Sequence, residues 1–258
     1  MKVVILCGGQ GTRLREETEY RPKPLVDVGG RPILWHIMKL YAHYGHRDFV
    51  LCLGYRGNMI KQYFLDYEAM TNDFTINLGR MHAVAYHGEH DEQNFSVTLA
   101  DTGQDTMTGG RVRRVQRYIK DDLFMVTYGD GVADVNVSAL VEFHKAHGRL
   151  ATITTMRPTS RFGILDLDAD GRVQRFAEKP QVDGWASAGF FVFHRKLFDH
   201  LDGDDCVLER EPLERLAAEG QLVAYRHAGF FFAMDTYREY VLLNDLWNSG
   251  KAPWKVWA

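Results

Sequence analysis

Short apolar runs that end at a glycine recur along the chain and provide its first structural signal. The clearest are residues 3–7, 49–53 and 123–128. Runs of this length and composition are typical of strands buried on both faces of a parallel sheet. After Pro32, apolar residues repeat at helical spacing from Leu34 to Tyr41, which predicts a helix with one buried face. The alternation of strand and helix therefore favours an α/β fold, with a parallel sheet covered by helices.

The same periodicities extend the prediction to most of the chain. Further helices are expected at residues 58–65, 110–119 and around 140–144, and further strands at residues 74–78, 83–86, 96–99, 151–156, 163–167, 173–176 and 188–193. Near the end, Thr236 and Glu239 stand at the spacing of a capping box, so they predict a helix that runs to Trp247. No repeat or linker divides the sequence, so residues 1–258 are expected to form one domain.

Composition and charge exclude several classes of protein. Of the 258 residues, 45% are hydrophobic and 25% are charged, as in globular chains rather than disordered ones. Lys and Arg number 31 against 34 Asp and Glu, so the net charge is −3 and there is no basic excess for nucleic-acid binding. Three cysteines (Cys7, Cys52 and Cys206) do not indicate a disulfide framework. No stretch reaches the ~18 apolar residues of a membrane span, and the N-terminal apolar run is shorter than a signal peptide requires. We therefore expect a cytoplasmic protein with no membrane or nucleic-acid partner.

The loop after the first strand carries the strongest chemical signal. It reads Gly8-Gly9-Gln10-Gly11-Thr12-Arg13-Leu14. Glycines let backbone N–H groups approach phosphate oxygens, while Thr12 adds a hydroxyl donor and Arg13 a planar cation. Lys23, set between two prolines, adds a second cation. Two cations in one loop favour a polyphosphate ligand over a glycine-rich turn that binds nothing. The loop matches neither the P-loop pattern nor the GxGxxG fingerprint of dinucleotide-binding folds.

Two carboxylates stand at positions that suit a metal ion. Asp130 lies just beyond the strand at residues 123–128, where ligands of open α/β sheets bind, and Asp235 precedes the C-terminal helix. Each could serve merely as a helix cap, but together they could hold Mg²⁺, whose other ligands would come from phosphates and water. Lys179 could meet a second anion, although a single lysine is more often a solvated surface residue. The histidines and acids from His82 to Glu92 match no familiar metal-site spacing.

Taken together, these motifs resemble the sugar-1-phosphate nucleotidyltransferases. The resemblance rests first on the loop at residues 8–14, on Thr18, and on the segments Arg21-Pro22-Lys23-Pro24-Leu25-Val26 and Gly29-Gly30-Arg31-Pro32. Within that family, the chain is most similar to the glucose-1-phosphate cytidylyltransferases, over essentially its whole length. The segments that carry this similarity are residues 32–39, 101–103, 107–111, 127–134 and 250–255.

The resemblance implies a fold and a reaction. The implied fold is a Rossmann-like, mostly parallel sheet flanked by helices, with a smaller strand-rich sugar-binding region at about residues 150–235. The implied reaction joins CTP and α-D-glucose 1-phosphate to give CDP-glucose and pyrophosphate, by Mg²⁺-dependent in-line attack on the α-phosphate. The C-terminal helix and its tryptophans would dock on the domain or take part in the contacts of a homo-oligomer.

The same resemblance implies which residues serve each part of the site. The catalytic residues would be Arg13, Lys23, Asp130 and Asp235, with Mg²⁺ held by Asp130 and Asp235. The nucleotide would be bound by Gly8, Gly9, Gly11, Thr12, Arg13, Lys23 and Arg111. The sugar phosphate would be bound by Glu178, Lys179, Ser187 and Gly189.

One segment departs from the glucose-specific pattern. Glucose-specific relatives carry Asn-Gly just before a Gly-Phe-Phe strand, whereas this chain reads Trp185-Ala186-Ser187-Ala188-Gly189 and is one residue shorter there. A hydroxyl in place of an amide could change which acceptor is recognised.

Three alternatives to the implied reaction stay open: a cytidylyltransferase for another sugar phosphate or phosphonate, an enzyme that uses uracil or thymine nucleotides, and a nucleotide-binding regulatory subunit without turnover.

Overall fold

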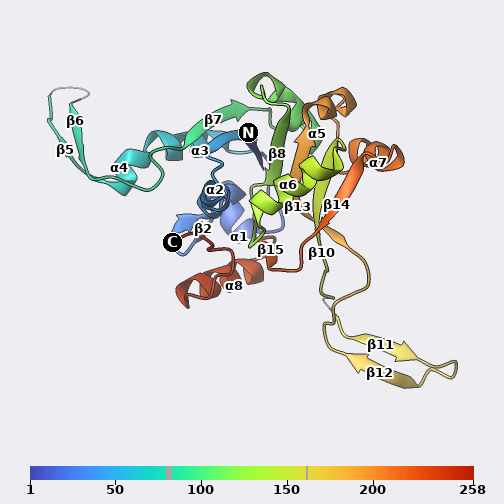
Figure 1. Ribbon diagram of the computed structural model, residues 1–258. Helices are drawn as coiled ribbons and strands as arrows, with labels where there is room; N and C mark the ends of the chain where they lie inside the picture. The colour runs from blue at the N-terminus through green and yellow to red at the C-terminus, as the bar shows by residue number, and fades with distance from the viewer. Residues whose placement is uncertain (80–82, 161) are drawn as a thin grey trace.

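The computed structural model describes residues 1–79, 83–160 and 162–258. At their centre lies a seven-stranded sheet in the order β14-β10-β13-β8-β1-β4-β7 (Figure 1). Its strands are β1 (Val3–Cys7), β4 (Asp48–Leu53), β7 (Ser96–Asp101), β8 (Leu123–Tyr128), β10 (Ala151–Met156), β13 (Ala186–His194) and β14 (Leu222–Arg226). Neighbouring strands run parallel, except where β13 pairs with β8 and β10. This arrangement confirms the expected mostly parallel α/β sheet.

The central strand β1 shows why the sheet is buried on both faces. Side chains alternate along a strand, so Val3, Ile5 and Cys7 enter one hydrophobic core while Val4 and Leu6 enter the other. The first core is covered by α2 (Ile33–His43), α3 (Gly57–Leu65), α6 (Val137–His147) and α8 (Tyr237–Asn248), and the second by α5 (Thr108–Arg114), α7 (Glu211–Ala218) and the 3-10 helix η3 (Arg195–His200). Burial on both faces explains why the strand sequences are continuously apolar.

Local signals in the sequence mark the start of the main helices. α2 begins directly after Pro32, and α8 begins with the predicted capping box. In that box, the Thr236 N–H donates to Glu239 Oε2 at 2.8 Å and the Glu239 N–H donates to Thr236 Oγ1 at 3.4 Å. The helix predicted at residues 110–119 is shorter than expected, because α5 ends at Arg114 and a 3-10 turn, η2 (Gln116–Tyr118), follows it. The stretch at residues 8–30, which follows β1, contains three short elements: α1 (Arg15–Thr18), η1 (Lys23–Leu25) and β2 (Asp27–Val28).

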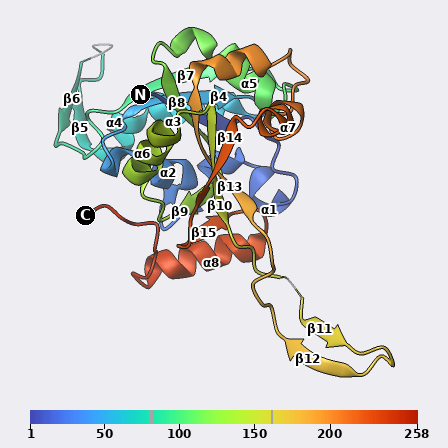
Figure 2. The same ribbon diagram turned by 45° about the vertical axis from the view of Figure 1, so that its right-hand side comes forward.

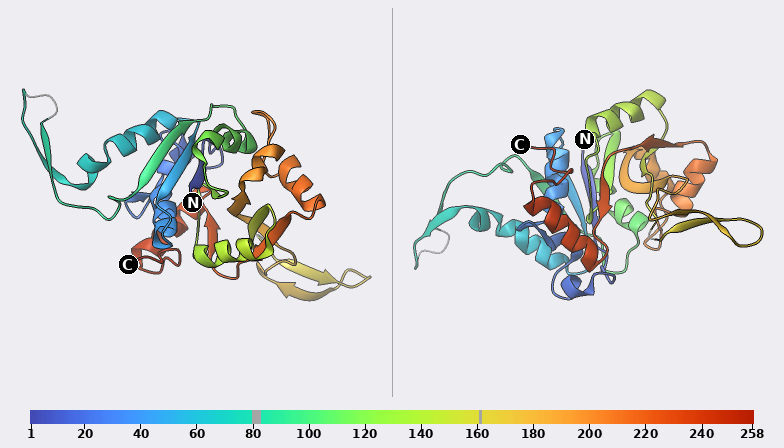
Figure 3. Two further views of the ribbon diagram at one scale, coloured as in Figure 1. Left: turned by 45° about the horizontal axis from the view of Figure 1, so that its top comes forward. Right: turned by 90° about the horizontal axis from the view of Figure 1, so that it is seen from below.

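Two-stranded sheets and a short helix complete the described fold. They are β2 with β3 (Arg31–Pro32), β5 (Asp73–Ile76) with β6 (Val84–His87), β9 (Gly131–Ala133) with β15 (Phe231–Ala233), β11 (Ile164–Leu167) with β12 (Val173–Ala177), and the helix α4 (Tyr67–Thr71) before β5. The β5–β6 and β11–β12 hairpins project from opposite ends of the molecule (Figures 1 and 3). In the strand-rich stretch at residues 150–235, β10, β13 and β14 join the central sheet, and the β11–β12 hairpin stands outside it.

The C-terminal segment folds back onto α2 of the same chain. Trp254 is 1% exposed, and its indole Nε1 donates to His36 Nδ1 at 3.3 Å. Trp35, Trp247 and Trp257 pack around the same histidine, and we call these five residues the aromatic cluster. Figure 2 shows α8 running below β15. The docking of the tryptophans on their own domain is thereby confirmed, while a role in oligomer contacts stays a prediction. Within the described residues, none of the helices is both long and apolar enough to cross a membrane.

Candidate active site

The loop after β1 is closed by its own backbone and by Thr18. The Thr18 hydroxyl lies 3.0 Å from the Gly11 carbonyl oxygen and 2.8 Å from that of Leu14. Gly11 has a φ of +64°, and a Cβ at this position would lie 2.8 Å from Thr18 Cγ2, so a side chain would be both strained and crowded. Thr12 and Arg13 remain exposed at the tip of the loop. The loop therefore holds a defined shape and presents its polar groups to solvent.

Arg111, on α5, braces this loop from inside the molecule. The residue is 5% exposed, and its two terminal nitrogens donate to Gly8 O (3.2 Å), Leu53 O (3.1 Å), Thr102 Oγ1 (2.9 Å), Gly103 O (2.7 Å) and Gln104 O (3.0 Å). A Cβ on Gly8 would lie 2.1 Å from Arg111 Nη1, so the close approach requires glycine. Burial lowers the pKa of Arg111. Arg111 is buried because the carboxyl ends of β1, β4 and β7 converge on its guanidinium. A direct contact with the nucleotide stays a prediction.

Four charged side chains from distant parts of the chain meet beside the loop. Lys23 Nζ lies 2.6 Å from Asp130 Oδ2 and 2.7 Å from Asp235 Oδ1, and Arg13 Nη1 lies 2.8 Å from Asp235 Oδ2. The pairing of β9 with β15 brings the carboxylates together, since Asp130 precedes β9 and Asp235 follows β15. The Met234 N–H also donates to the Asp130 carbonyl oxygen at 2.9 Å. We call Arg13, Lys23, Asp130 and Asp235 the charge cluster; the structure brings together all four residues predicted to be catalytic.

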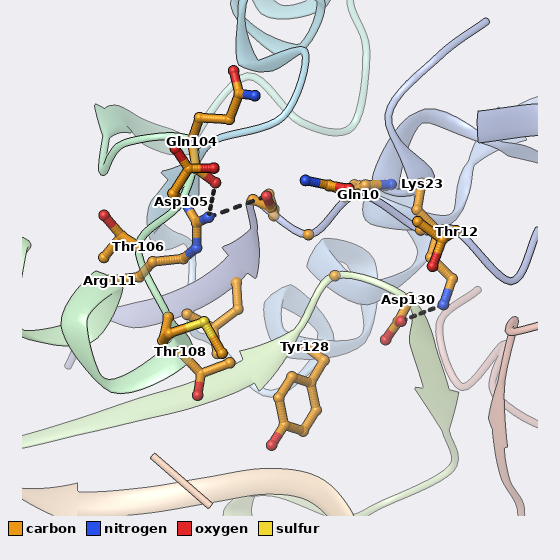
Figure 4. A pocket seen from close by; sticks show the side chains of 18 of the residues that line it. Gln10, Thr12, Lys23, Gln104, Asp105, Thr106, Thr108, Arg111, Tyr128 and Asp130 are labelled. Carbon is orange, nitrogen blue, oxygen red and sulfur yellow. Dashed lines mark hydrogen bonds and ion pairs between the residues drawn. The ribbon is translucent and has the colours of Figure 1, made fainter. Parts of the chain in front are cut away.

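Two pockets meet at the charge cluster. The larger, which we call the loop-side pocket, has a volume of about 480 Å³ and is shown in Figure 4. It is lined mainly by residues 8–13, Lys23, residues 104–108, Arg111, Tyr128 and Asp130. The smaller, which we call the β13-side pocket, has a volume of about 310 Å³ and is lined mainly by Arg13, residues 127–128, Asp130, residues 187–190, Phe231 and Asp235. Both volumes fall within the range of small-molecule sites. Arg13, Tyr128 and Asp130 line both pockets, so ligands in the two would meet at these residues.

Asp130 and Asp235 have the chemistry of a magnesium site. One ammonium nitrogen already contacts an oxygen of each carboxylate, so the space between them accepts a cation. Mg²⁺ prefers oxygen ligands, and it commonly takes one or two carboxylates together with phosphates and water. Among the described residues, no group of three or more His, Cys, Asp or Glu side chains is placed to hold a metal ion. A metal at this pair of carboxylates would therefore need further oxygen ligands from a bound substrate.

The predicted sugar-phosphate residues divide into two groups. Ser187 and Gly189 line the β13-side pocket, and their role in binding the sugar phosphate stays a prediction. Lys179 and Glu178 do not belong to the linings of these two pockets. They follow β12 at the base of the projecting hairpin, where Lys179 has a φ of +46° and its Nζ lies 3.5 Å from Glu178 Oε1. The roles of this lysine and glutamate in binding the sugar phosphate stay predictions.

The structure also adds residues to the site that were not among its predicted members. Residues 104–107, between β7 and α5, and Thr108, the first residue of α5, form one wall of the loop-side pocket. Glu209 accepts hydrogen bonds from the hydroxyls of Tyr128 and Thr108. Glu209 lies in the connection before α7, outside any motif, so nothing in the sequence pointed to it.

The histidines near residue 90 do not form a metal site in the described part of the chain. His87 Nε2 lies 2.8 Å from Thr75 Oγ1, and His90 Nε2 lies 2.9 Å from Glu68 Oε1. His82 lies outside the described residues.

Known proteins are similar to this chain in sequence and in fold. Residues 2–232 match the family described as nucleotidyl transferase. The chain is 50% identical to the glucose-1-phosphate cytidylyltransferase of Salmonella typhi and 46% identical to the probable glucose-1-phosphate cytidylyltransferase of Bacillus subtilis (strain 168), with 100% of each chain covered in both comparisons. Among solved structures, HddC from Yersinia pseudotuberculosis has a similar fold, with a TM-score of 0.69 at 23% identity over 95% of this chain and 99% of that chain. The sequence match over the length of the sheet, together with the shared fold, shows that the chain belongs to the nucleotidyl transferase family.

Proposed function

We propose that this protein is a glucose-1-phosphate cytidylyltransferase, which converts CTP and α-D-glucose 1-phosphate into CDP-glucose and pyrophosphate. The observation that carries the proposal is the charge cluster, which stands where two pockets meet. The choice of substrates follows the two full-length relatives, at 50% and 46% identity, whose names state glucose 1-phosphate and cytidylyl transfer.

The two pockets suit the two substrates. In the loop-side pocket, the glycine loop, Thr12 and Lys23 supply donors for a triphosphate. The β13-side pocket, lined by Ser187 and Gly189, suits the glucose ring. Because Arg13 and Asp130 line both pockets, the α-phosphate of CTP and the attacking sugar phosphate would meet beside them. Holding two polyanions in this geometry is the main contribution that the protein makes to the rate.

The reaction requires no nucleophilic side chain. An oxygen of the sugar phosphate, largely ionised near pH 7 because its second pKa is ~6, attacks the α-phosphorus of CTP. As this P–O bond forms, the bond from the α-phosphorus to the oxygen that bridges it to the β-phosphate breaks, and pyrophosphate leaves with that electron pair. Arg13 and Lys23 would neutralise the charge that develops on the leaving group. Cys7, beneath the loop, takes no part, since burial raises the pKa of its thiol well above the ordinary value.

We assign Mg²⁺ as the cofactor, held by Asp130 and Asp235. When bound, the metal would offset phosphate charge and orient the α-phosphate. In the free protein, Lys23 lies between these carboxylates and relieves their mutual repulsion. The Lys23 ammonium must therefore release the carboxylates, and it would move onto the phosphate oxygens as nucleotide and metal arrive.

The two projecting hairpins support assembly into a homo-oligomer. The β5–β6 hairpin exposes Phe74 and Ile76, and the β11–β12 hairpin exposes Leu165, Leu167 and Phe176. Large apolar side chains that extend away from the body of a protein commonly mark a protein contact, and a second copy of this chain would bury them. The cytoplasmic location stays a prediction; it accords with three cysteines that are all free.

Pyrophosphate release, measured with Mg²⁺ for CTP, UTP, dTTP and ATP against a panel of sugar 1-phosphates, tests the function. The fastest release is expected with CTP and glucose 1-phosphate.

Arg13→Ala should lower kcat by about 10²-fold with a smaller change in KM for the sugar phosphate, since the guanidinium would act on developing charge. Arg15→Ala, on the exposed side of α1, is the matched control and should retain normal turnover.

The other outcomes of the same measurement separate the alternatives. CTP-dependent release with a different acceptor would support the same reaction with another sugar phosphate. Ser187 and its neighbours would then be the residues to examine for acceptor choice. CTP binding without release from any pair would favour the regulatory subunit.

A further inference from the structure

Tyr128 stands at the boundary between the two pockets. It is the last residue of β8 and lines both the loop-side and the β13-side pocket. The other side chains shared by the two linings, Arg13 and Asp130, are charged. In Figure 4 the phenol ring lies at the floor of the loop-side pocket, with its hydroxyl directed away from Lys23 and Asp130. Tyr128 thus presents an uncharged aromatic surface where the two substrates would meet.

The position of the Tyr128 ring is set by the backbone of β13. Gly189 has a φ of +73°, and a Cβ at this position would lie 2.3 Å from Tyr128 Cδ2. The ring therefore fills the space that a side chain at position 189 would need. Phe191 packs against the same ring with its centroid 6.1 Å away, in an edge-on arrangement. These contacts restrict the ring on the β13 side.

Glu209 holds the other end of Tyr128. The Tyr128 hydroxyl donates to Glu209 Oε1, and the Thr108 hydroxyl donates to Glu209 Oε2 at 2.6 Å. Thr108 lines the loop-side pocket at the start of α5, and its Oγ1 also accepts from the Leu208 N–H at 2.9 Å. One carboxylate therefore connects the wall of the loop-side pocket to the boundary between the pockets. Burial and the adjacent Glu209 carboxylate raise the pKa of Tyr128, so the phenol keeps its proton and remains a donor.

The surroundings of Glu209 favour a positioning role over a role in folding. Its hydrogen bonds to Tyr128 and Thr108 lie at the exposed surface, where water can replace either partner, so these bonds contribute little to stability. In the described part of the chain, no Lys, Arg or His forms an ion pair with it. A carboxylate beside a site for two polyanions opposes their charge. Glu209 therefore contributes to the site through its two hydrogen bonds and not through its charge.

We propose that Glu209 is a positioning residue, which fixes Tyr128 as the wall between the nucleotide and the acceptor sugar. By holding Thr108 with its second oxygen, it sets the separation of the two pockets and with it the alignment of the sugar phosphate with the α-phosphate. The inference rests on the proposed assignment of the two substrates to the two pockets.

A double-mutant cycle of Tyr128→Phe, Glu209→Ala and their combination tests this role, with kcat and both KM values measured for each. Each single variant should lower kcat/KM for glucose 1-phosphate by about 10- to 100-fold, because a shift of about 1 Å in a reacting group costs this much. KM for CTP should change by less than about threefold. In the double variant, kcat/KM should be no lower than in the poorer single variant, since both changes break the same hydrogen bond. Glu209→Gln should recover most of the activity, because an amide can bond to both hydroxyls.

Matched controls separate positioning from loss of structure. Glu219→Ala removes an exposed carboxylate that pairs with Arg215 on α7, and it should leave the kinetics unchanged. The melting temperatures of the Glu209 and Tyr128 variants should stay within a few degrees of the parent protein. Wild-type kcat/KM in both single variants, or single effects that multiply in the double variant, would overturn the proposal. If Arg13→Ala loses turnover while the cycle shows no coupling, the positioning role fails and the proposed function stands.

Discussion

Two contacts join the C-terminal part of the chain to residues near its start. One is made by charged groups and the other by aromatic rings. In the charge cluster, Lys23 bonds to Asp235 across 212 positions of the sequence. In the aromatic cluster, Trp254 bonds to His36 across 218 positions. The charge cluster lies at two open pockets, whereas Trp254 and His36 are almost fully buried.

The difference separates the parts of the protein that act from those that hold it together. Ion pairs contribute little net stability because desolvation offsets much of their attraction, so a ligand can rearrange them at small cost. A buried tryptophan contributes through its large apolar surface and close packing, and it cannot move without opening a cavity. Changes to the charge cluster should therefore act on turnover, and changes to the aromatic cluster on folding.

The largest effect is expected from Lys23→Met. Loss of the ammonium removes charge stabilisation of the leaving group, so kcat should fall by about 10³-fold, as measured by pyrophosphate release. Without nucleotide, Mn²⁺ should bind more tightly to the variant in an EPR titration, because the ammonium no longer competes for Asp130 and Asp235. Mn²⁺ should also raise the melting temperature of the variant more than that of the parent. Lys120→Met, at an exposed site, should leave all three quantities unchanged. Equal Mn²⁺ affinity in variant and parent would show that Lys23 does not compete with the metal.

The next effect is expected from Trp254→Ala. Trp254 is 1% exposed and stacks on Phe230 and Trp247, with centroids 5.7 and 6.3 Å away. Its removal should lower the free energy of unfolding by about 3 kcal/mol, measured by chemical denaturation, while kcat changes by less than about twofold. Trp185→Ala is the control for tryptophan loss, because Trp185 is 42% exposed and its removal should alter stability little. A large loss of kcat in folded Trp254→Ala protein would contradict the separation of the two clusters.

The smallest effect concerns the pH dependence of stability. Burial lowers the pKa of His36 from 6.5 to about 4, and its Nε2 lies 2.8 Å from the Val28 carbonyl oxygen while Nδ1 accepts from Trp254. Below pH 6.5 the unfolded chain therefore binds more protons at this residue than the folded chain does. Stability from His36 is fully present above pH 6.5 and is lost as pH falls toward 4, by up to about 1.4 kcal/mol per pH unit.

The variant His36→Gln isolates this contribution. The slope of unfolding free energy between pH 6.5 and 4.5 should be shallower in the variant than in the parent. Part of the slope should remain, because burial also lowers the pKa of His144 to about 4. Parallel slopes in the two proteins would mean that His36 is not the titrating group.

Strands and helices that are determined by residues close together in the chain could be predicted from the sequence. The buried strands β1, β4 and β8, the start of α2 after Pro32 and the capping box of α8 each follow from residues within a few positions of one another. The sequence also marks the residues of the charge cluster, because Arg13 lies in the glycine-rich loop, Lys23 stands between two prolines, Asp130 follows a buried strand and Asp235 precedes the C-terminal helix. Their contacts could not be predicted, since the pairing of β9 with β15 sets the distance between Asp130 and Asp235.

Other features arose only when distant segments came together. Arg111 belongs to an arginine-rich helix, yet carbonyl oxygens at the carboxyl ends of β1, β4 and β7 surround its guanidinium. Glu209 has no motif, and it reaches Tyr128 across 81 positions because α5 and the connection before α7 meet at the end of β8. Periodicity and turn chemistry report on neighbours along the chain, so they reveal strands, helices and glycine loops. The direction of a buried arginine and the partner of an isolated carboxylate depend on the order of strands in the sheet, which no local pattern encodes.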